Sequence, residues 1–258
     1  MRRDTSSGPR PKNVYFFATC LVDLFCPEAG MDAIALLERE GLTVHFPENQ
    51  TCCGQPAYTS GYADAARAVA LTQMRLFPND WPIVVPSGSC AGMMRHHYPR
   101  LFADDPQLQA EAEALAERVF ELSEFLLEVL KVQWKGAGKA ATVTLHTSCA
   151  ARREMGTHVH ARALLAQLPG VDVLTQSHES ECCGFGGTFS LKHPAISSAM
   201  AGDKADALKE TGAQTFLSAD CGCLLNINHT LQKRGDTFQG KHLATFLLER
   251  LTAPGEKA

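Results

Sequence analysis

The tripeptide Cys-Cys-Gly occurs twice in this chain of 258 residues, at residues 52–54 and 182–184. A single cysteine precedes each pair, Cys20 by 32 positions and Cys149 by 33, and a further cysteine follows each pair at a matching distance. Chance does not place eight cysteines in register, so the spacing predicts an internal duplication that divides the chain into two halves. The duplicated cysteines are Cys20, Cys52, Cys53 and Cys90 in the first half and Cys149, Cys182, Cys183 and Cys221 in the second.

Both halves show the same alternation of short apolar runs, which predict strands, with segments that have helical signals. One such helix is expected between Pro27 and Gly41, with Met31, Ile34 and Leu37 as its buried stripe. Strands that alternate with helices are typical of parallel sheets, in which ligands bind beyond the carboxyl ends of the strands. We therefore expect an α/β fold of two similar halves, each a small parallel sheet flanked by helices. The expected strands are 14–18, 43–46, 82–85, 142–145, 171–174 and 214–217, and further expected helices are 62–77, 152–168 and 241–251.

The boundary between the halves is expected at Gly136-Ala-Gly138. It separates a first repeat at residues 13–135 from a second at residues 139–253. Linking helices are expected at the end of the first repeat, one beginning at Asp105-Pro106 and one capped by Ser123. Their many acidic residues are expected on a solvated face.

The composition excludes several classes of protein. Lys and Arg number 24 against 28 Asp and Glu, and the formal net charge of −4 gives no electrostatic attraction to nucleic acid or anionic lipid. No apolar run approaches the ~18 residues that span a bilayer, and the run after the basic N-terminus is shorter than the ~7–15 residues of a secretory signal. We therefore expect a cytoplasmic protein with reduced thiols, in which ten cysteines indicate metal or redox chemistry.

The vicinal pairs favour a metal cluster. Adjacent Cα atoms lie only ~3.8 Å apart, closer than the ~4.4–6.8 Å of a relaxed disulfide. As thiolates, adjacent cysteines can bind different metal atoms, and each half offers the four thiolates that a four-iron cluster needs. The second half adds Cys223 and is the stronger candidate, with zinc as the alternative metal. Cys26 has no counterpart and is expected to be an ordinary buried thiol.

Several polar residues beside the cysteines have both a functional and a structural interpretation. His146 lies three residues before Cys149 and either orients or protonates a group at a cluster or is an ordinary strand-end histidine. Asp220 either supports the metal ligands or caps a helix. Ser87 and Ser89 either donate hydroxyls to sulfur or form a turn.

Six motifs surround the cysteines, and they occur in the order Ala18-Thr-Cys-Leu-Val-Asp23, Cys52-Cys-Gly-Gln-Pro-Ala-Tyr58, Pro86-Ser-Gly-Ser-Cys90, Leu145-His-Thr-Ser-Cys149, Cys182-Cys-Gly-Phe-Gly-Gly-Thr-Phe-Ser190 and Ala219-Asp-Cys-Gly-Cys-Leu-Leu-Asn226. They resemble the duplicated cysteine-rich (Cys-Cys-Gly) domain of heterodisulfide reductase and of the iron–sulfur subunits of glycolate oxidase and anaerobic glycerol-3-phosphate dehydrogenase. A closer resemblance, over about residues 14–250, is to the lactate utilization protein A family.

The resemblance implies an iron–sulfur electron-transfer subunit, not an autonomous enzyme, of a cytoplasmic complex that oxidises L-lactate to pyruvate. It implies other lactate utilization subunits as partners, one of which carries ferredoxin-type clusters. The alternative that it implies is a subunit like that of heterodisulfide reductase, which reduces a disulfide or thiol substrate at an iron–sulfur cluster. The implied cofactor is one or two 4Fe-4S clusters, with the second site preferred, and the candidate ligands are Cys20, Cys52, Cys53, Cys90, Cys149, Cys182, Cys183, Cys221 and Cys223.

This sequence departs from the heterodisulfide reductase pattern at the end of each half. That enzyme ends each set with Cys-x-x-Cys, whereas Cys90 is followed by Met93 here and the second set ends Cys221-Gly-Cys223. The first site therefore has one candidate ligand fewer than the second. Ala150 stands where relatives commonly have a histidine.

Overall fold

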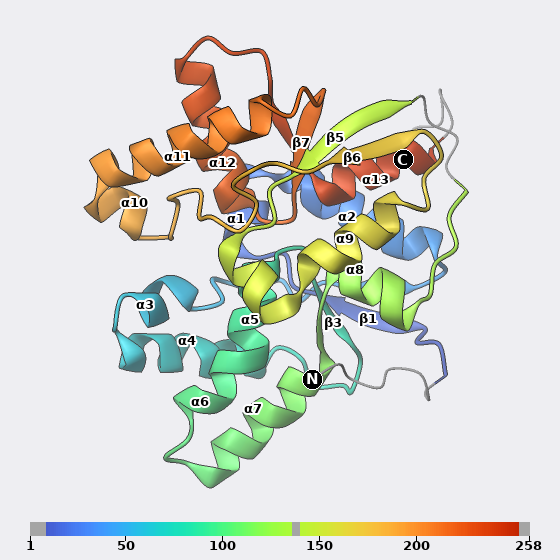
Figure 1. Cartoon of the computed structure of the whole chain (residues 1–258). Helices are drawn as coiled ribbons and strands as arrows, with labels where there is room; N and C mark the ends of the chain where they lie inside the picture. The colour runs from blue at the N-terminus through green and yellow to red at the C-terminus, as the bar shows by residue number, and fades with distance from the viewer. Residues whose placement is uncertain (1–8, 136–139, 253–258) are drawn as a thin grey trace.

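The computed structural model describes residues 9–135 and 140–252. Two four-stranded sheets, all parallel, have the strand orders β2-β1-β3-β4 and β6-β5-β7-β8 (Figure 1). The prediction of two similar α/β halves is confirmed, while the expected boundary at 136–138 lies outside the described residues. The strands are β1 (Asn13–Phe16), β2 (Thr43–His45), β3 (Ile83–Val85) and β4 (Val119–Glu121) in the first sheet, and β5 (Ala141–Leu145), β6 (Val171–Leu174), β7 (Thr215–Ser218) and β8 (Gly240–His242) in the second.

Helices cover the faces of both sheets and connect the parallel strands. Those of the first half are α1 (Cys20–Phe25), α2 (Pro27–Arg39), α3 (Gln55–Thr59), α4 (Ala63–Met74), α5 (Gly88–Gly92), α6 (Tyr98–Leu101), α7 (Pro106–Arg118) and α8 (Leu122–Glu124), with π-helical turns η1 (Met93–His97) and η2 (Phe125–Val129). Those of the second half are η3 (Ala151–Met155), α9 (Thr157–Leu165), α10 (Phe189–Lys192), α11 (Pro194–Lys209), α12 (Cys221–Lys233) and α13 (Leu243–Leu251).

The register of the two sheets defines equivalent positions in the two halves. The first residue after β1, Phe17, donates its backbone N–H to Val84 of β3 (3.0 Å). The first residue after β5, His146, donates its N–H to Leu217 of β7 in the same way (2.9 Å). Phe17 and His146 are therefore equivalent, and each begins the segment that leads to its half's first duplicated cysteine.

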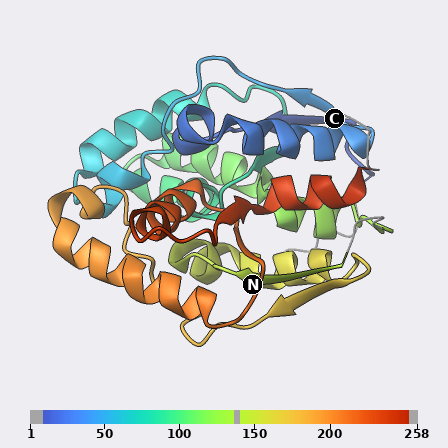
Figure 2. The ribbon, with the colours of Figure 1, turned by 90° about the horizontal axis from the view of Figure 1, so that it is seen from above.

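A hydrophobic core shared by both halves joins the two sheets. Side chains alternate along a strand, so β1 sends Val14 and Phe16 into the shared core and Tyr15 and Phe17 into a second core on the opposite face of its sheet. The last helix, α13, packs against α2 of the first half, and Figure 2 shows these two helices side by side. Because this core includes residues of both sheets, it fixes the carboxyl ends of both sheets relative to each other.

The predicted buried stripe of α2 is wrong at one position. Met31 is 64% exposed, whereas Ala33, Leu36 and Leu37 are fully buried in the shared core. The helix faces the core with a stripe of small and branched residues, and Ile34 packs at its margin. The position of α13 decides which side of the helix is covered.

Two further local predictions are corrected. The single helix expected over 152–168 is interrupted at Gly156, whose left-handed backbone (φ +64°) ends η3 and begins α9. Ser123 does not cap its helix, because the unexpected strand β4 intervenes and Glu121 caps α8 instead. Glu121 and Glu124 are also buried or nearly so rather than solvated, with Glu121 accepting the backbone N–H groups of α8.

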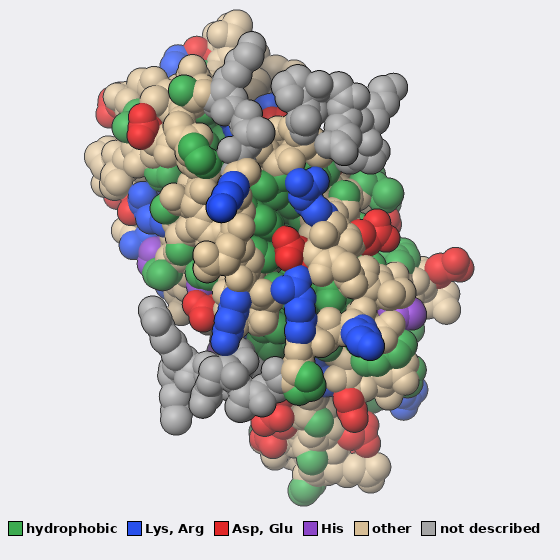
Figure 3. All heavy atoms as spheres, turned by 90° about the vertical axis from the view of Figure 1, so that its right-hand side faces the viewer, with side chains coloured by type: hydrophobic (Ala, Val, Ile, Leu, Met, Phe, Trp, Pro, Cys, Tyr) green, Lys and Arg blue, Asp and Glu red, His purple; other side chains and the backbone are tan. Residues whose placement is uncertain are grey.

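The face shown in Figure 3 carries an ordinary polar surface. Lys and Arg side chains are interspersed with Asp and Glu over this face, and apolar side chains are visible between them. No large patch of one sign is formed by the side chains drawn there, in agreement with the small net charge. Among the described helices, none combines the length and apolar character needed to cross a membrane.

Candidate functional site

The carboxyl ends of both sheets face one cavity of about 230 Å³. Its lining includes residues of α3 and α5 of the first half and of α12 of the second half, and Figure 1 shows α3 and α5 below α12. The shared core brings the two halves together at this edge, so the two cysteine sets predicted as separate sites line the same cavity. The lining includes all nine candidate ligands: Cys20, Cys52, Cys53, Cys90, Cys149, Cys182, Cys183, Cys221 and Cys223.

In the first half, four thiols form a chain of hydrogen bonds. Cys20 begins α1, Cys52 and Cys53 lie in the loop before α3, and Cys90 lies in α5. The thiol of Cys20 and then that of Cys53 donate to Cys52 and lower its pKa to about 3, and the N–H of Gly54 also donates to its sulfur (3.4 Å). The same contact raises the pKa of Cys20, and contacts with Cys52 and Cys90 raise that of the buried Cys53.

The second half repeats this arrangement. Cys149 and Cys183 donate to Cys182 and lower its pKa far below its ordinary value, and Gly184 N–H donates to its sulfur (3.3 Å). The contact with Cys183 is also the largest cause of the lowered pKa of Cys223, which is about 6. Hydrogen bonds to sulfur favour the thiolate form, which is the form that binds metal.

The counterpart of Cys90 is Cys223 and not Cys221, which the spacing alone had indicated. Ser87 and Asp220 are the residues before α5 and α12, and each is followed three positions later by the cysteine that joins its half's thiol chain. Cys221 is equivalent to Gly88. A Cβ atom at Gly88 would lie 2.4 Å from the Cβ of Ala151, so the first half has no room for a side chain there.

Cys221 instead contacts Cys26, the cysteine without a counterpart. The Cys221 thiol donates to the sulfur of Cys26, which raises the pKa of Cys221 and lowers that of Cys26. Cys26 follows α1 of the first half, so this thiol pair joins the two halves beside the cavity. Cys26 is only partly buried, and the prediction of an ordinary buried thiol missed its contact with Cys221.

Polar side chains also join the halves at the cavity. Asp220 Oδ1 accepts from the hydroxyls of Ser87 (2.7 Å) and Ser89 (2.6 Å) and from the N–H of Ser89 (3.1 Å). Asp220 precedes α12 but its side chain makes no capping bond to that helix, and its carboxylate bonds instead to the serines of the first half. The serine hydroxyls donate to this carboxylate, and the interpretation in which they donate to sulfur is not the one observed.

Two glutamines that sequence reasoning missed hold the ends of the central strands. Gln50 bonds to Phe16 O (2.8 Å) and to the N–H of Ala18 (2.9 Å). Gln176 donates to Leu145 O (2.5 Å) at the equivalent place in the second half. A glutamine shortly before each Cys-Cys-Gly sequence was the only signal in the chain, and the two spacings differ.

Backbone strain also recurs at equivalent positions. Thr19 (φ +70°) and Ser148 (φ +44°) are two of the three non-glycine residues in the described chain with positive φ. Each directly precedes the first cysteine of its set, Cys20 or Cys149. Strained backbone persists where the surrounding structure enforces it, and it is concentrated at functional sites.

Comparisons with known proteins agree with this duplicated site. The cysteine-rich domain family matches the chain twice, at residues 14–95 and 143–228. Proteins named lactate utilization protein A are 44% identical over 235 residues in Shouchella clausii, covering 91% of this chain and 98% of that protein, and 44% identical over 237 residues in Geobacillus kaustophilus, covering 92% and 99%.

A solved structure shares the fold. It is a hypothetical protein from Helicobacter pylori with a TM-score of 0.67 at 12% sequence identity, and the match covers 97% of this chain but spans only half of the other. The two cysteine-rich repeats and the identity to full-length relatives lead to one conclusion: the chain belongs to the lactate utilization protein A family.

Proposed function

We propose that this protein is an iron–sulfur electron-transfer subunit of a cytoplasmic complex that oxidises L-lactate to pyruvate. The observation that carries the proposal is the single cavity lined by two equivalent chains of thiols. Four cysteines in each half supply the ligand number of a 4Fe-4S cluster. Lactate enters the proposal through the name of the relatives, lactate utilization protein A.

The residues fit an iron–sulfur cluster better than a zinc ion. Structural zinc takes four ligands around one metal atom. Here Cys52 contacts Cys20 and Cys53, and Cys53 contacts Cys90 in turn, so the four thiols form a chain, an arrangement that favours several metal atoms over one. Backbone N–H groups of Gly54 and Gly184 already donate to sulfur, a contact that tunes cluster potentials. When bound, such clusters supply one-electron steps.

We assign all nine cavity cysteines as candidate ligands, with two equivalent sets of four. Cys221 is the additional thiol of the second half, and its contact with Cys26 sets it apart from those sets. The proposed partners are other lactate utilization subunits, one of them carrying ferredoxin-type clusters. Electrons would pass between this cavity and those clusters.

Anaerobic purification with iron and sulfide analysis and EPR tests the cluster. We expect iron and acid-labile sulfide in near-equal amounts, and loss of most of the second site's signal in Cys182→Ser. Reconstitution with the partner subunits then tests the substrate, because L-lactate should reduce the clusters only when all subunits are present. Zinc in place of iron, or unchanged iron in Cys182→Ser, contradicts the proposal.

A second candidate function is reduction of a disulfide or thiol substrate at a cluster. The observation that favours it is the size of the cavity, about 230 Å³ between the two cysteine sets, which is enough for a small ligand. The purified, iron-loaded protein is supplied with an artificial electron donor and small disulfides. Turnover supports this function, whereas lactate oxidation by the assembled complex without disulfide turnover excludes it.

A further inference from the structure

The two thiol sets have the same cysteines but different surroundings. Behind the first set, Phe17 is fully buried and packs edge to face against Phe77 (ring centroids 6.2 Å apart). Behind the second set, the equivalent residue is His146, which is 2% exposed. Equivalent positions therefore carry an apolar ring in one half and an imidazole in the other, so the two sites are chemically different.

His146 is placed as a metal ligand would be. One of its ring nitrogens and the sulfurs of Cys183 and Cys223 all lie within 4.8 Å of one another. Both ring nitrogens are buried and lack a hydrogen bond of normal geometry among the described residues, and the ring contacts the sulfur of Cys223 and helps to lower the pKa of that thiol. Leaving a buried polar group without a well-formed partner costs about 1–3 kcal/mol, so a metal ion between the ring and these sulfurs would satisfy a nitrogen that the polypeptide does not.

A small cavity lies beside the same histidine. It has a volume of about 20 Å³ and is lined by His146, His158, Ser218 and Asp220 among others. This is enough for one water molecule, which needs about 10–15 Å³. A single water can satisfy one ring nitrogen but not both, and metal-ligating histidines characteristically bond their second nitrogen to such a group.

A second difference also distinguishes the surroundings of the two thiol sets. Gly54 lies against Ala66, and Gly184 lies against Ser197 in the same way, so Ala66 and Ser197 are equivalent. Gln73 and Lys204 each lie seven residues further along the chain and are therefore equivalent too. Gln73 bonds to Thr51 (2.8 Å), whereas Lys204 is 1% exposed and donates to Gln176 (3.3 Å). The second site therefore has a buried ammonium group near its thiols where the first has a neutral amide.

We propose that His146 binds metal through a ring nitrogen beside Cys183 and Cys223 and takes the place of one of the four thiolates at the second site. This inference rests on the proposed function and deepens it, since it makes the second site a mixed histidine–cysteine centre. Histidine ligation in place of thiolate raises the potential of an iron–sulfur centre. The two sites of this duplicated protein therefore have different potentials, with the second site as the stronger electron acceptor.

The test uses the full-length, iron-loaded protein and pulsed EPR, in protein labelled with ¹⁵N-histidine and in unlabelled protein. We expect the nitrogen coupling of a directly bound imidazole in the parent and its loss in His146→Phe, which installs the first half's own residue. His158→Phe is the matched control, because it removes a neighbouring histidine of the same small cavity. Lys204→Gln, which introduces the amide that Gln73 provides in the first half, should keep the coupling and lower the potential of the second site.

A folding control keeps the result interpretable. His146→Cys restores a ligand, so it should hold as much iron as the parent while losing the nitrogen coupling and lowering the potential. Iron-loaded parent protein without histidine coupling, or coupling that persists in His146→Phe, overturns the inference. Parent protein without iron instead overturns the proposed function. In that case Co²⁺ is bound to the parent and to His146→Phe, and the absorption bands of the bound Co²⁺ should differ between the two proteins. Identical bands overturn the inference.

Discussion

Ser87 and Asp220 occupy equivalent positions in the two halves, and they hydrogen-bond to each other across the cavity (Ser87 Oγ to Asp220 Oδ1, 2.7 Å). Each is the residue before a helix that presents a cysteine three positions later, Cys90 or Cys223. This hydrogen bond between duplicated positions therefore acts together with the shared core to hold the two thiol sets at one cavity.

Removing this carboxylate should destabilise the protein more than removing one hydroxyl. Asp220→Ala leaves the buried Ser87 hydroxyl and the donors of Ser89 without their acceptor, a loss of about 2–3 kcal/mol. Ser87→Ala leaves Asp220 with both of its bonds to Ser89 and should cost about 1 kcal/mol. Urea unfolding of the metal-free protein measures both values. Asp203→Ala, at an exposed position of α11, is the control, and equal losses for Asp220→Ala and Ser87→Ala would contradict the interpretation.

The duplication, the central strands and the outer strands β2 and β6 were predictable from the sequence, whereas the outer strands β4 and β8 were not. β1, β3, β5 and β7 are apolar runs because both of their faces are covered. β4 and β8 have only three residues each and include Glu121 and Lys241, so they do not form an apolar run. They become strands because a parallel neighbour supplies their hydrogen bonds.

The site was predictable in composition but not in arrangement. Cysteine spacing identified the nine cavity residues, but counting from the vicinal pairs selected Cys221 as the partner of Cys90. The position at which α12 begins shows that Cys223 is the counterpart of Cys90. The first half has Gly88 in place of Cys221 because Gly88 packs closely against η3. The contact between Cys26 and Cys221 depends on how the halves pack, which local sequence does not encode.

The equivalence of Cys90 and Cys223 predicts an order of iron loss. Cys223→Ser should remove most of the second site's iron, as Cys90→Ser should at the first site, because each deletes one of four equivalent thiols. Cys221→Ser and Cys26→Ser should each keep more than half of the parent's iron. Iron per protein after anaerobic reconstitution measures this. Greater loss in Cys221→Ser than in Cys223→Ser would restore Cys221 as the counterpart of Cys90.

The glycines after the two vicinal pairs should differ in their tolerance of a side chain. Both have left-handed backbone, φ +87° at Gly54 and +81° at Gly184, so alanine costs about 1–2 kcal/mol at either position. A Cβ at Gly184 would also lie 2.6 Å from the backbone oxygen of Ser197, whereas at Gly54 the nearest atom is 3.4 Å away. Gly184→Ala should therefore be less stable than Gly54→Ala by about 1–3 kcal/mol. Thermal unfolding of the two variants side by side checks this, and equal melting temperatures would refute it.

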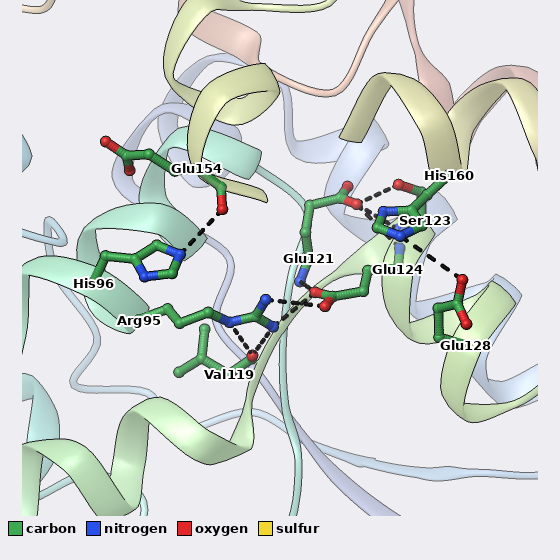
Figure 4. Close-up of polar contacts among 9 residues, drawn as sticks. All are labelled: Arg95, His96, Val119, Glu121, Ser123, Glu124, Glu128, Glu154 and His160. Carbon is green, nitrogen blue, oxygen red and sulfur yellow. Dashed lines mark hydrogen bonds and ion pairs between the residues drawn. The ribbon is translucent and has the colours of Figure 1, made fainter. Parts of the chain in front are cut away.

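A buried carboxyl between the halves should make stability depend on pH. Figure 4 shows Glu121 directed toward Ser123, beside the ion pair that Arg95 makes with Glu124 (2.7 Å). Burial raises the pKa of Glu121 from 4.5 to about 7, and the hydrogen bonds from Ser123 and the N–H of Glu124 oppose this only partly. Between these two pH values the folded protein holds a proton that the unfolded chain has released, so stability falls as the pH rises from about 4.5 to 7.

Glu121→Gln isolates this contribution, because glutamine keeps an acceptor for the same N–H groups and does not ionise. The stability of the variant minus that of the parent should be constant below pH 4.5 and grow up to about pH 7, where it levels off. The total increase should approach about 3 kcal/mol, at ~1.4 kcal/mol for each unit of pKa shift. Urea unfolding at several pH values measures the difference, with Glu113→Gln on the exposed face of α7 as the control that should show none. Parallel curves for the parent and Glu121→Gln would mean that the carboxyl ionises normally, and water would then have to reach it between the two halves.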